Sequence, residues 1–132
     1  MPTLLITGGA GFIGGHTASL ALDLGWDVRI LDNLSTGRQE TVEALEVKGA
    51  NFIMGDVRDE AVVNNAVNGC DAVAHFAAQV SVPRSVEHPQ ETMDINVGGT
   101  STILKACQVH GVNRFVMASS AAVYGTKDDF PL

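Results

Sequence analysis

The chain has 132 residues, of which 45% are hydrophobic and 17% charged, and its formal net charge is -7 at pH 7. This length and composition predict a single globular domain over residues 1–132 and exclude an intrinsically disordered chain. The negative charge argues against non-specific binding to nucleic acid or to an anionic membrane, because their phosphate groups would repel it.

The sequence shows no sign of export, membrane insertion or metal binding. It contains no apolar run long enough to span a bilayer and no signal-peptide pattern, so we expect a cytoplasmic location. Cys70 and Cys107 are too few and too isolated for a disulfide framework, and we expect two small buried side chains. The four histidines lack metal-ligand spacing, so no metal site is predicted.

Short apolar runs alternate with helical patterns along the chain. Strands are predicted at Thr3–Thr7, Asp27–Leu31, Asn51–Met54, Asp71–His75 and Arg114–Ala118. Their centres are almost continuously apolar, which is typical of parallel strands covered on both faces. This alternation predicts right-handed crossovers and an α/β fold, a doubly wound parallel sheet in the order 3-2-1-4-5.

Helices are predicted between these strands. They cover Gly11–Leu24, Arg38–Val47, the segment between Asp59 and Gly69, and Pro89–His110. The first helix carries one apolar face, which comprises Ile13, Thr17, Leu20, Ala21 and Leu24. Asp59 is a candidate N-cap for the third helix. The sequence contains no repeat, low-complexity tract or linker.

A cluster of glycines follows the first predicted strand and opens the first predicted helix. Gly8, Gly11 and Gly14 form G-x-x-G-x-x-G, and Gly9, Gly11 and Gly14 also satisfy G-x-G-x-x-G. Such glycines permit a tight turn, a close approach of backbone amides to a pyrophosphate, and close packing of helix on strand. The helix N-terminus adds unpaired N–H groups and a positive dipole end. We therefore predict a nucleotide-binding turn; the alternative is a purely structural turn.

Two aspartates follow the next two strands. Asp32 ends the second strand, where a carboxylate accepts hydrogen bonds from ribose hydroxyls and repels a 2′-phosphate, so NAD is favoured over NADP. Arg38 could bind a 2′-phosphate, but it fits better as a solvated residue at a helix start. Asp56 follows the third strand, and contact with adenine and a turn or cap role both remain open.

These residues belong to six segments that carry a family resemblance. The segments are Thr7–Gly14, Asp32–Gly37, Gly55–Asp59, His75–Gln79, Asn96–Thr100 and Ser119–Gly125. Through them the chain resembles the extended short-chain dehydrogenase/reductases of the NAD-dependent epimerase/dehydratase group, and within that group the N-terminal part of the UDP-glucose 4-epimerases. The resemblance implies a C-terminally truncated Rossmann domain that lacks the later strands and the substrate domain. It does not identify the sugar, because decarboxylases, dehydratases and other epimerases share these segments.

The resemblance implies a cofactor-binding role for residues at the ends of the strands. At the pyrophosphate turn these residues are Gly8, Gly11, Phe12, Ile13 and Gly14. The adenosine ribose would contact Asp32, Asn33, Ser35 and Thr36, and adenine would contact Asp56 and Val57. The nicotinamide side would be lined by Ala77, Ala78 and Gln79. Asn96 would support the site from the long helix. The alternative interpretation is a polar helix residue whose side chain is hydrogen-bonded to backbone groups.

The catalytic groups of the family are only partly represented. Ser120 matches the hydroxyl residue that positions the sugar for oxidation. The family's general base is a tyrosine with a lysine four residues later, but Tyr124 is the only tyrosine and Asp128 stands four residues after it. We do not expect Lys127 to replace that lysine, because the spacing is three residues and no helical pattern surrounds it.

The first functional hypothesis is therefore an NAD-binding N-terminal portion of a UDP-sugar 4-epimerase-like enzyme, catalytically incomplete as written. It would bind a UDP-sugar only if the missing C-terminal part were supplied. The second hypothesis is a non-catalytic nucleotide-binding module, in one form a homodimer joined through Arg114–Ala118 or Pro89–His110. A folded remnant without any ligand is a third interpretation.

Overall fold

A parallel five-stranded sheet forms the centre of the molecule. The computed structural model describes residues 1–126, 128–129 and 131. Its strands are β1 (Thr3–Thr7), β2 (Asp27–Asp32), β3 (Asn51–Met54), β4 (Ala72–His75) and β5 (Phe115–Met117). They lie in the order β3-β2-β1-β4-β5, which confirms the predicted topology. The register pairs Thr7 with Leu31 on one side and with His75 on the other, so the carboxyl ends of these strands meet at one edge.

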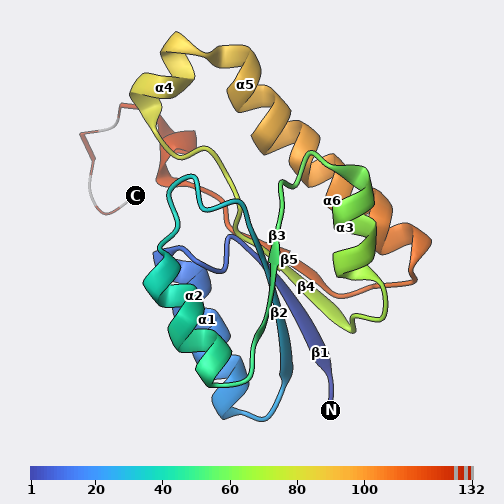
Figure 1. The fold of residues 1–132 in the computed structure, drawn as a ribbon. Helices are drawn as coiled ribbons and strands as arrows, with labels where there is room; N and C mark the ends of the chain where they lie inside the picture. The colour runs from blue at the N-terminus through green and yellow to red at the C-terminus, as the bar shows by residue number, and fades with distance from the viewer. Residues whose placement is uncertain (127, 130, 132) are drawn as a thin grey trace.

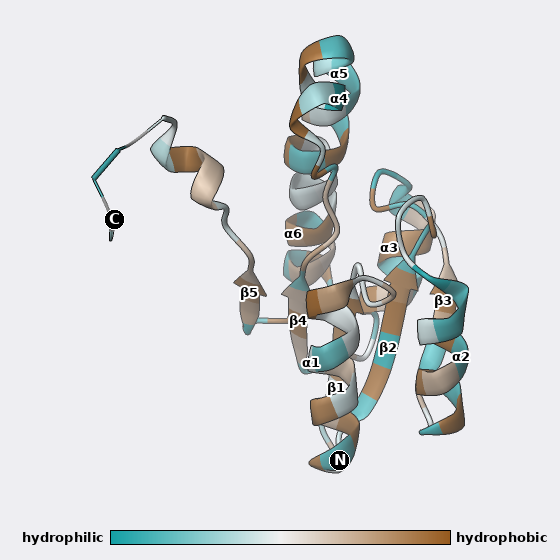
Figure 2. Ribbon diagram, turned by 90° about the vertical axis from the view of Figure 1, so that its left-hand side faces the viewer, coloured by the Kyte–Doolittle hydropathy of each residue, from teal (hydrophilic) through white to brown (hydrophobic). Residues whose placement is uncertain are grey.

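Helices cover both faces of the sheet. Figure 1 shows α1 (Phe12–Asp23) and α2 (Gln39–Val47) on one face, and α3 (Glu60–Val67) and α6 (Gly99–Val109) on the other. The strands carry many hydrophobic residues, as Figure 2 shows for β5. Two layers of helices explain this composition, because both faces of a central strand are removed from water.

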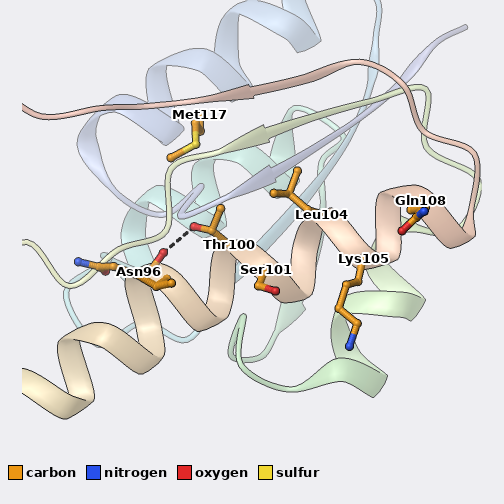
Figure 3. Close-up of a pocket in the computed structure, with 8 residues that line it drawn as sticks. Asn96, Thr100, Ser101, Leu104, Lys105, Gln108 and Met117 are labelled. Atoms are coloured by element: carbon orange, nitrogen blue, oxygen red, sulfur yellow. Dashed lines mark hydrogen bonds between the residues drawn. The ribbon is translucent and has the colours of Figure 1, made fainter.

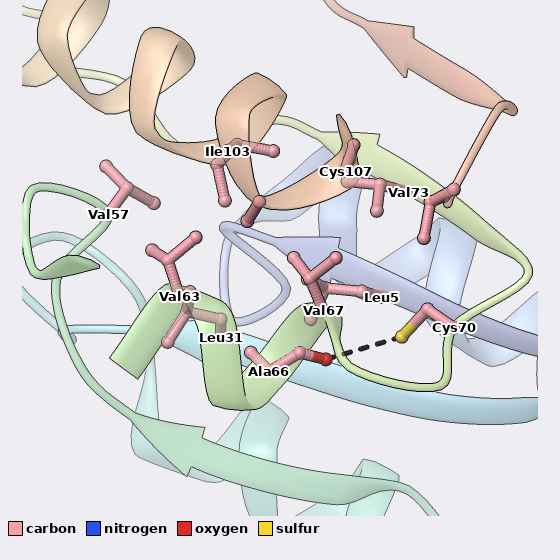
Figure 4. Packing of buried hydrophobic residues seen from close by; sticks show 12 residues of the cluster. Leu5, Leu31, Val57, Val63, Ala66, Val67, Cys70, Val73, Ile103 and Cys107 are labelled. Carbon is pink, nitrogen blue, oxygen red and sulfur yellow. Dashed lines mark hydrogen bonds between the residues drawn. The ribbon is translucent and has the colours of Figure 1, made fainter. Parts of the chain in front are cut away.

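The core is divided by the sheet into two clusters. The cluster under α3 and α6 appears in Figure 4 and contains Leu5, Leu31, Val57, Val63, Ala66, Val67, Cys70, Val73, Ile103, Ala106, Cys107 and Val112. Both cysteines are free and buried, as predicted. Burial raises the pKa of both thiols, so they act as small apolar side chains. Asp59 caps α3 through its carboxylate, which accepts hydrogen bonds from the amides of Ala61 and Val62.

Helix α1 packs through a face that shares Ala21 with the predicted one but not its larger apolar residues. Gly14, Gly15, Ala18 and Ala21 are its buried residues. The predicted apolar residues Ile13, Leu20 and Leu24 are 59%, 60% and 68% exposed. An added Cβ on Gly14 would meet the Gly8 backbone, and one on Gly15 would meet the Thr41 side chain of α2, so glycine fits both contacts. The partly buried Leu22 also packs against the core, while Ile13, Leu20 and Leu24 point outward.

The long predicted helix Pro89–His110 is divided into three parts. It comprises α5 (Pro89–Met93), a π-helical turn η1 (Asp94–Gly98) and α6. A π-turn accommodates one extra residue and is common where a side chain is re-aimed. The residue at its centre, Asn96, binds the backbone of a neighbouring loop. The short helix α4 (Val82–Glu87), which we did not predict, has a cap from Ser81 but buries no residue. A 3-10 turn, η2 (Ala121–Tyr124), follows β5.

No helix in the described part of the chain combines the length and the apolar character needed to cross a membrane.

Candidate functional site

The turn after β1 is built from backbone contacts that leave no room for side chains. The Gly8 amide donates to the Leu31 carbonyl at 2.8 Å, and the Gly11 amide donates to the Gly8 carbonyl at 3.1 Å. Gly8 has a φ of +71°, and a Cβ there would lie 2.9 Å from the Ala77 nitrogen. A Cβ on Gly14 would lie 2.2 Å from the Gly8 oxygen. These contacts require glycine at both positions.

The turn presents the open N-terminus of α1. Gly11 is the N-cap residue, so no side chain caps the helix, and the first turn contains no acidic residue. The amides of Phe12, Ile13 and Gly14 therefore have no partner within the helix. Phe12 and Ile13 are 83% and 59% exposed beside them. A 12-residue helix that begins in this way favours a phosphate group at its positive end.

Asp32, at the end of β2, joins the glycine turn to the loop that follows β2. One carboxylate oxygen accepts a hydrogen bond from the Ala10 amide at 3.0 Å, and the other accepts one from the Leu34 amide at 2.8 Å. The residue is 9% exposed. Leu34 has a φ of +59°, and the bond from its amide helps to hold this uncommon conformation. Because each carboxylate oxygen can accept a second hydrogen bond, Asp32 retains the capacity to bind hydroxyls.

The neighbouring loops after β2 and β3 form a second polar group. Asn33 accepts a hydrogen bond from the Ser35 amide at 3.0 Å and donates one to Asp56 at 3.3 Å. Arg58 holds the same carboxylate with two side-chain bonds of 2.9 and 2.7 Å, and its backbone amide adds a third at 2.8 Å. The Arg58 guanidinium lowers the pKa of Asp56 to about 2, so this carboxylate is ionised at neutral pH.

The pKa of Asp56 gives a direct test of the Arg58 contact. In Arg58→Leu we expect the pKa to rise from about 2 towards its ordinary value of 3.8, because the largest stabiliser of the charged form is removed. The depressed pKa stabilises the fold above pH 3.8, and this contribution is lost as the pH falls towards 2. Carboxyl ¹³C NMR would measure the titration. Arg84→Leu, which removes the exposed pair with Glu91, is the matched control and should leave Asp56 unchanged.

The loop after β4 is held by Asn96 from the π-turn. The side-chain oxygen of Asn96 accepts the Gln79 amide at 2.7 Å, and its side-chain nitrogen donates to the Gln79 carbonyl at 3.1 Å. Ala77 is tied to β1, because its amide donates to the Thr7 hydroxyl at 3.1 Å. Ala78 is exposed between these two anchors. The loop therefore has a defined path beside the glycine turn.

Three further residues of the predicted site are Val57, Thr36 and Ser120, and each lies in a different environment. Val57 is 6% exposed, and its side chain packs in the core against α6, so only its backbone faces the loops. Thr36 is exposed in the loop after β2. Ser120 is exposed after β5, and its hydroxyl accepts the Ala122 amide at 3.1 Å as the cap of η2. The predicted absence of a Tyr124–Lys127 pair stays a prediction, because Lys127 lies outside the described residues.

Sequence reasoning missed several groups that organise this edge. Arg58 orients Asp56, while Thr7, His75 and Thr100 form a hydrogen-bonded chain between β1, β4 and α6. A polar residue at the end of an apolar strand, such as Thr7 or His75, was the available signal. Among the described residues, no group of three or more His, Cys, Asp or Glu side chains is arranged to hold a metal ion.

A separate groove lies between α6 and β5. Its volume is about 520 Å³, and its lining comprises Asn96, Val97, Thr100, Ser101, Leu104, Lys105, Gln108 and Met117 (Figure 3). The lining is largely apolar, and Val97, Leu104 and Met117 are 56%, 45% and 50% exposed. The groove adjoins the loop after β4 through Asn96 but contains no residue of the glycine turn.

The chain matches a known protein family over almost its whole length. The sequence profile described as the NAD dependent epimerase/dehydratase family matches residues 4–132. The chain belongs to this family. Within the epimerase/dehydratase family, a curated UDP-glucose 4-epimerase of Corynebacterium glutamicum is 44% identical over 129 residues, which cover 98% of this chain and 38% of that protein. A UDP-glucose 4-epimerase of Klebsiella pneumoniae is 41% identical, with 97% and 96% covered.

Solved structures of the family agree with this assignment. A UDP-glucose 4-epimerase from Stenotrophomonas maltophila, which contains bound NAD and formylated UDP-arabinopyranose, superposes with a TM-score of 0.90 at 36% identity. The match covers 100% of this chain and 41% of that one. The chain thus spans about two fifths of the length of the Corynebacterium and Stenotrophomonas proteins. It corresponds to the N-terminal portion of UDP-glucose 4-epimerase-like proteins.

Proposed function

We propose that the chain binds NAD at the edge formed by the carboxyl ends of β1, β2 and β4. The pyrophosphate would lie at the N-terminus of α1, on the amides of Phe12, Ile13 and Gly14, with Gly8 and Gly11 giving it access. Asp32 would accept hydrogen bonds from the adenosine ribose, assisted by the loop of Asn33, Ser35 and Thr36. Adenine would face Asp56 and the backbone of Val57, and the nicotinamide would face the Ala77–Gln79 loop.

The observation that carries this proposal is the junction of an uncapped helix N-terminus with Asp32. The helix offers free amides to a phosphate, and Asp32 lies across the same turn through its bond to Ala10. Asp32 holds the turn by accepting the Ala10 and Leu34 amides, and each of its oxygens keeps the capacity to accept a ligand hydroxyl. NAD is the cofactor bound in the similar Stenotrophomonas structure, which supports the choice of ligand.

In the longer relatives the cofactor would remove and return a hydride at the sugar, while the protein orients the groups and moves protons. Ser120 would contribute the hydroxyl that positions the sugar. The 132 residues contain no Tyr-x-x-x-Lys sequence. We propose that they retain cofactor binding without epimerase activity of their own, because loss of a positioned general base costs about 10²–10⁴-fold in rate.

Calorimetric titration of the purified chain with NAD tests the binding proposal. We expect saturable binding with one NAD per chain and a weaker response to NADP, because the Asp32 carboxylate would repel a 2′-phosphate. No heat of binding from a sample shown to be folded by circular dichroism would reject the proposal.

A fusion tests the epimerase assignment. Joining the chain to the C-terminal part of a relative should restore 4-epimerase activity on a UDP-sugar. No product from any nucleotide sugar would reject the epimerase assignment.

A second candidate function is that of a binding module that acts as a homodimer. It is favoured by the exposed apolar residues of β5 and the adjoining groove, where Val116 is 65% and Met117 50% exposed. Pairing of two β5 edges would satisfy the unpaired backbone groups of this edge strand. Light scattering at increasing concentration tests it, and a monomer that binds NAD at the highest concentration would exclude this form of the module.

A further inference from the structure

A buried chain of hydrogen bonds crosses the fold beneath the proposed nucleotide site. His75, the last residue of β4, is 4% exposed. Its Nδ1 lies 2.6 Å from the Thr7 hydroxyl on β1, and its Nε2 lies 3.0 Å from the Thr100 hydroxyl on α6. The two threonines are 93 positions apart in the sequence, so the ring joins elements that meet only in the folded chain.

The neighbouring hydrogen bonds determine which group is donor and which is acceptor in each bond to His75. The Thr100 hydroxyl donates to the Asn96 carbonyl at 2.6 Å, so its oxygen can only accept from His75. The Thr7 hydroxyl oxygen accepts the Ala77 amide at 3.1 Å and, at 3.0 Å, shares the Phe76 amide with the Thr7 carbonyl oxygen, which lies 3.1 Å from the same nitrogen. The hydroxyl proton is left for Nδ1 of His75. Only the neutral ring with its proton on Nε2 satisfies both threonines.

A charged ring does not fit the same environment. Protonated Nδ1 would face a Thr7 hydroxyl oxygen that already accepts the Ala77 amide and shares the Phe76 amide with the Thr7 carbonyl. The groups that face the ring are uncharged: Thr7 from β1, Thr100 from α6 and Phe115 from β5, whose ring centroid lies 6.2 Å away. Burial lowers the pKa of His75, in agreement with this geometry.

The two ends of this series of hydrogen bonds lie beside the two loops that would hold the cofactor. Thr7 directly precedes Gly8, and its hydroxyl anchors the amides that begin the Ala77–Gln79 loop. On the other side, Thr100 joins the π-turn at the carbonyl of Asn96, whose side chain holds Gln79. His75 is therefore the link between the supports of the glycine turn and of the loop after β4.

We propose that His75 is a positioning residue of the nucleotide site. Its neutral ring, with the proton on Nε2, joins Thr7 to Thr100 by hydrogen bonds, and this link, called the relay below, sets the spacing of the glycine turn and the Ala77–Gln79 loop. The inference rests on the proposed NAD binding for its functional consequence. The relay itself is a property of the free protein and can be tested without any ligand.

Ring ¹⁵N NMR of the ligand-free protein tests the relay directly. We expect a protonated Nε2 and an unprotonated Nδ1 for His75 at pH 7, with no titration near its ordinary pKa of 6.5. An Nδ1–H tautomer, or a ring that becomes charged near pH 6.5 while the protein stays folded, would overturn the proposal. His110, which contacts the Asn64 side chain at 3.2 Å outside the relay, provides the reference signal.

The pH dependence of folding provides a second readout. Because the folded pKa of His75 is lowered, the unfolded chain binds the proton first. Above pH 6.5 the ring is neutral in both states, and His75 does not lower the stability of the fold. As the pH falls below 6.5 towards the folded pKa, the folding equilibrium constant decreases by up to about tenfold per pH unit. His75→Gln should remove this component and His110→Gln should retain it; identical profiles for the two variants would contradict the relay.

NAD affinity tests the positioning role. We expect Thr100→Val and His75→Phe to weaken NAD binding by about tenfold, because each leaves a polar partner of the relay unsatisfied. Val73→Ala, which truncates a buried residue of the same strand, should lower stability but keep NAD affinity within about twofold. Equal losses in all three folded variants, or no loss in the first two, would overturn the positioning role. If the wild-type chain fails to bind NAD, the proposed function fails, while the ring spectra still decide the relay.

Discussion

Replacement of Asp32 by alanine is expected to weaken NAD binding by about 100-fold. Hydrogen bonds from two ribose hydroxyls to a carboxylate contribute about 1.5–3 kcal/mol each, and 1.4 kcal/mol corresponds to a factor of ten. The substitution also removes the acceptor for the Ala10 and Leu34 amides, which join the glycine turn to the loop after β2. Ala10 is 1% exposed, so its amide would lose its partner in the interior.

Asp32→Asn separates the two consequences. Asparagine has the shape of aspartate, but its amide nitrogen is a donor and cannot accept the Ala10 or Leu34 amide that faces it. We expect an intermediate loss of NAD affinity and a smaller preference for NAD over NADP, because the charge that would repel a 2′-phosphate is gone. Calorimetry with both nucleotides measures these effects.

Asp27→Ala is the matched control, because Asp27 is an exposed carboxylate at the other end of the same strand. Its NAD affinity should remain within about twofold of the wild type, as expected for a surface change away from the site. Unaltered NAD affinity in folded Asp32→Ala would show that the cofactor, if it binds, does not use this carboxylate.

Replacement of Gly14 by alanine is expected to reduce the free energy of unfolding by about 3 kcal/mol, the upper range for an overpacked site. The new methyl group would lie 2.2 Å from the Gly8 oxygen and 2.8 Å from the Gly9 Cα. Both neighbours are backbone atoms, so no side-chain rotation relieves the clash. Helix α1 must move away from the glycine turn, and NAD affinity should fall with it.

Gly98→Ala is the control for the intrinsic effect of the substitution. Gly98 has helical backbone angles, with φ of -61° and ψ of -46°, and an added Cβ would approach only the Met93 oxygen, at 3.9 Å. Alanine there should stabilise the fold by about 0.5–1 kcal/mol, because glycine loses more backbone entropy on folding. Urea unfolding measures both variants. Similar unfolding midpoints for the two would mean that α1 does not approach the turn as closely as its contacts indicate.

The two predictions concern the two sides of one junction. Gly14 sets how closely α1 approaches β1, and Asp32 ties the resulting turn to the end of β2. An Asp32 variant should lose a ligand contact and also some stability, because the Ala10 and Leu34 amides lose their acceptor. A Gly14 variant should lose only the supporting geometry, because Gly14 has no side chain that could contact a ligand. NAD affinity compared at similar loss of stability therefore separates the ligand contact from the supporting geometry.

The sequence determined the elements and their order because those depend on local patterns. Continuous apolar runs identified all five strands, and their alternation with helical stretches predicted the observed 3-2-1-4-5 sheet. The glycines between β1 and α1, and the cap at Asp59, were recognisable for the same reason, since each acts on residues within a few positions. The ends of parallel strands then had to meet at one edge, which brought the candidate residues together.

Contacts between distant residues were decided by the tertiary structure. Helical periodicity pointed to Ile13, Leu20 and Leu24 as the packed face of α1, but the close approach of the helix to the glycine turn placed Gly14 on the packed side, together with Ala18 and the partly buried Leu22. Periodicity shows which side chains of a helix are apolar, but it gives no information on how closely the helix packs against its neighbours. The π-turn in the long helix escaped prediction for a similar reason, because the residue at its centre, Asn96, engages the backbone of a loop 17 residues earlier.

The polar connections of the site also required the folded chain. Thr7 and His75 are 68 residues apart, and His75 and Thr100 are 25 apart, yet the His75 imidazole joins the two threonines. Nothing in the sequence near His75 specifies its partners, because they are set by the pairing of β1 with β4 and by the packing of α6. The sequence alone therefore determined which residue types reach the edge of the sheet, and tertiary packing decided which of them bind one another and which remain free for a ligand.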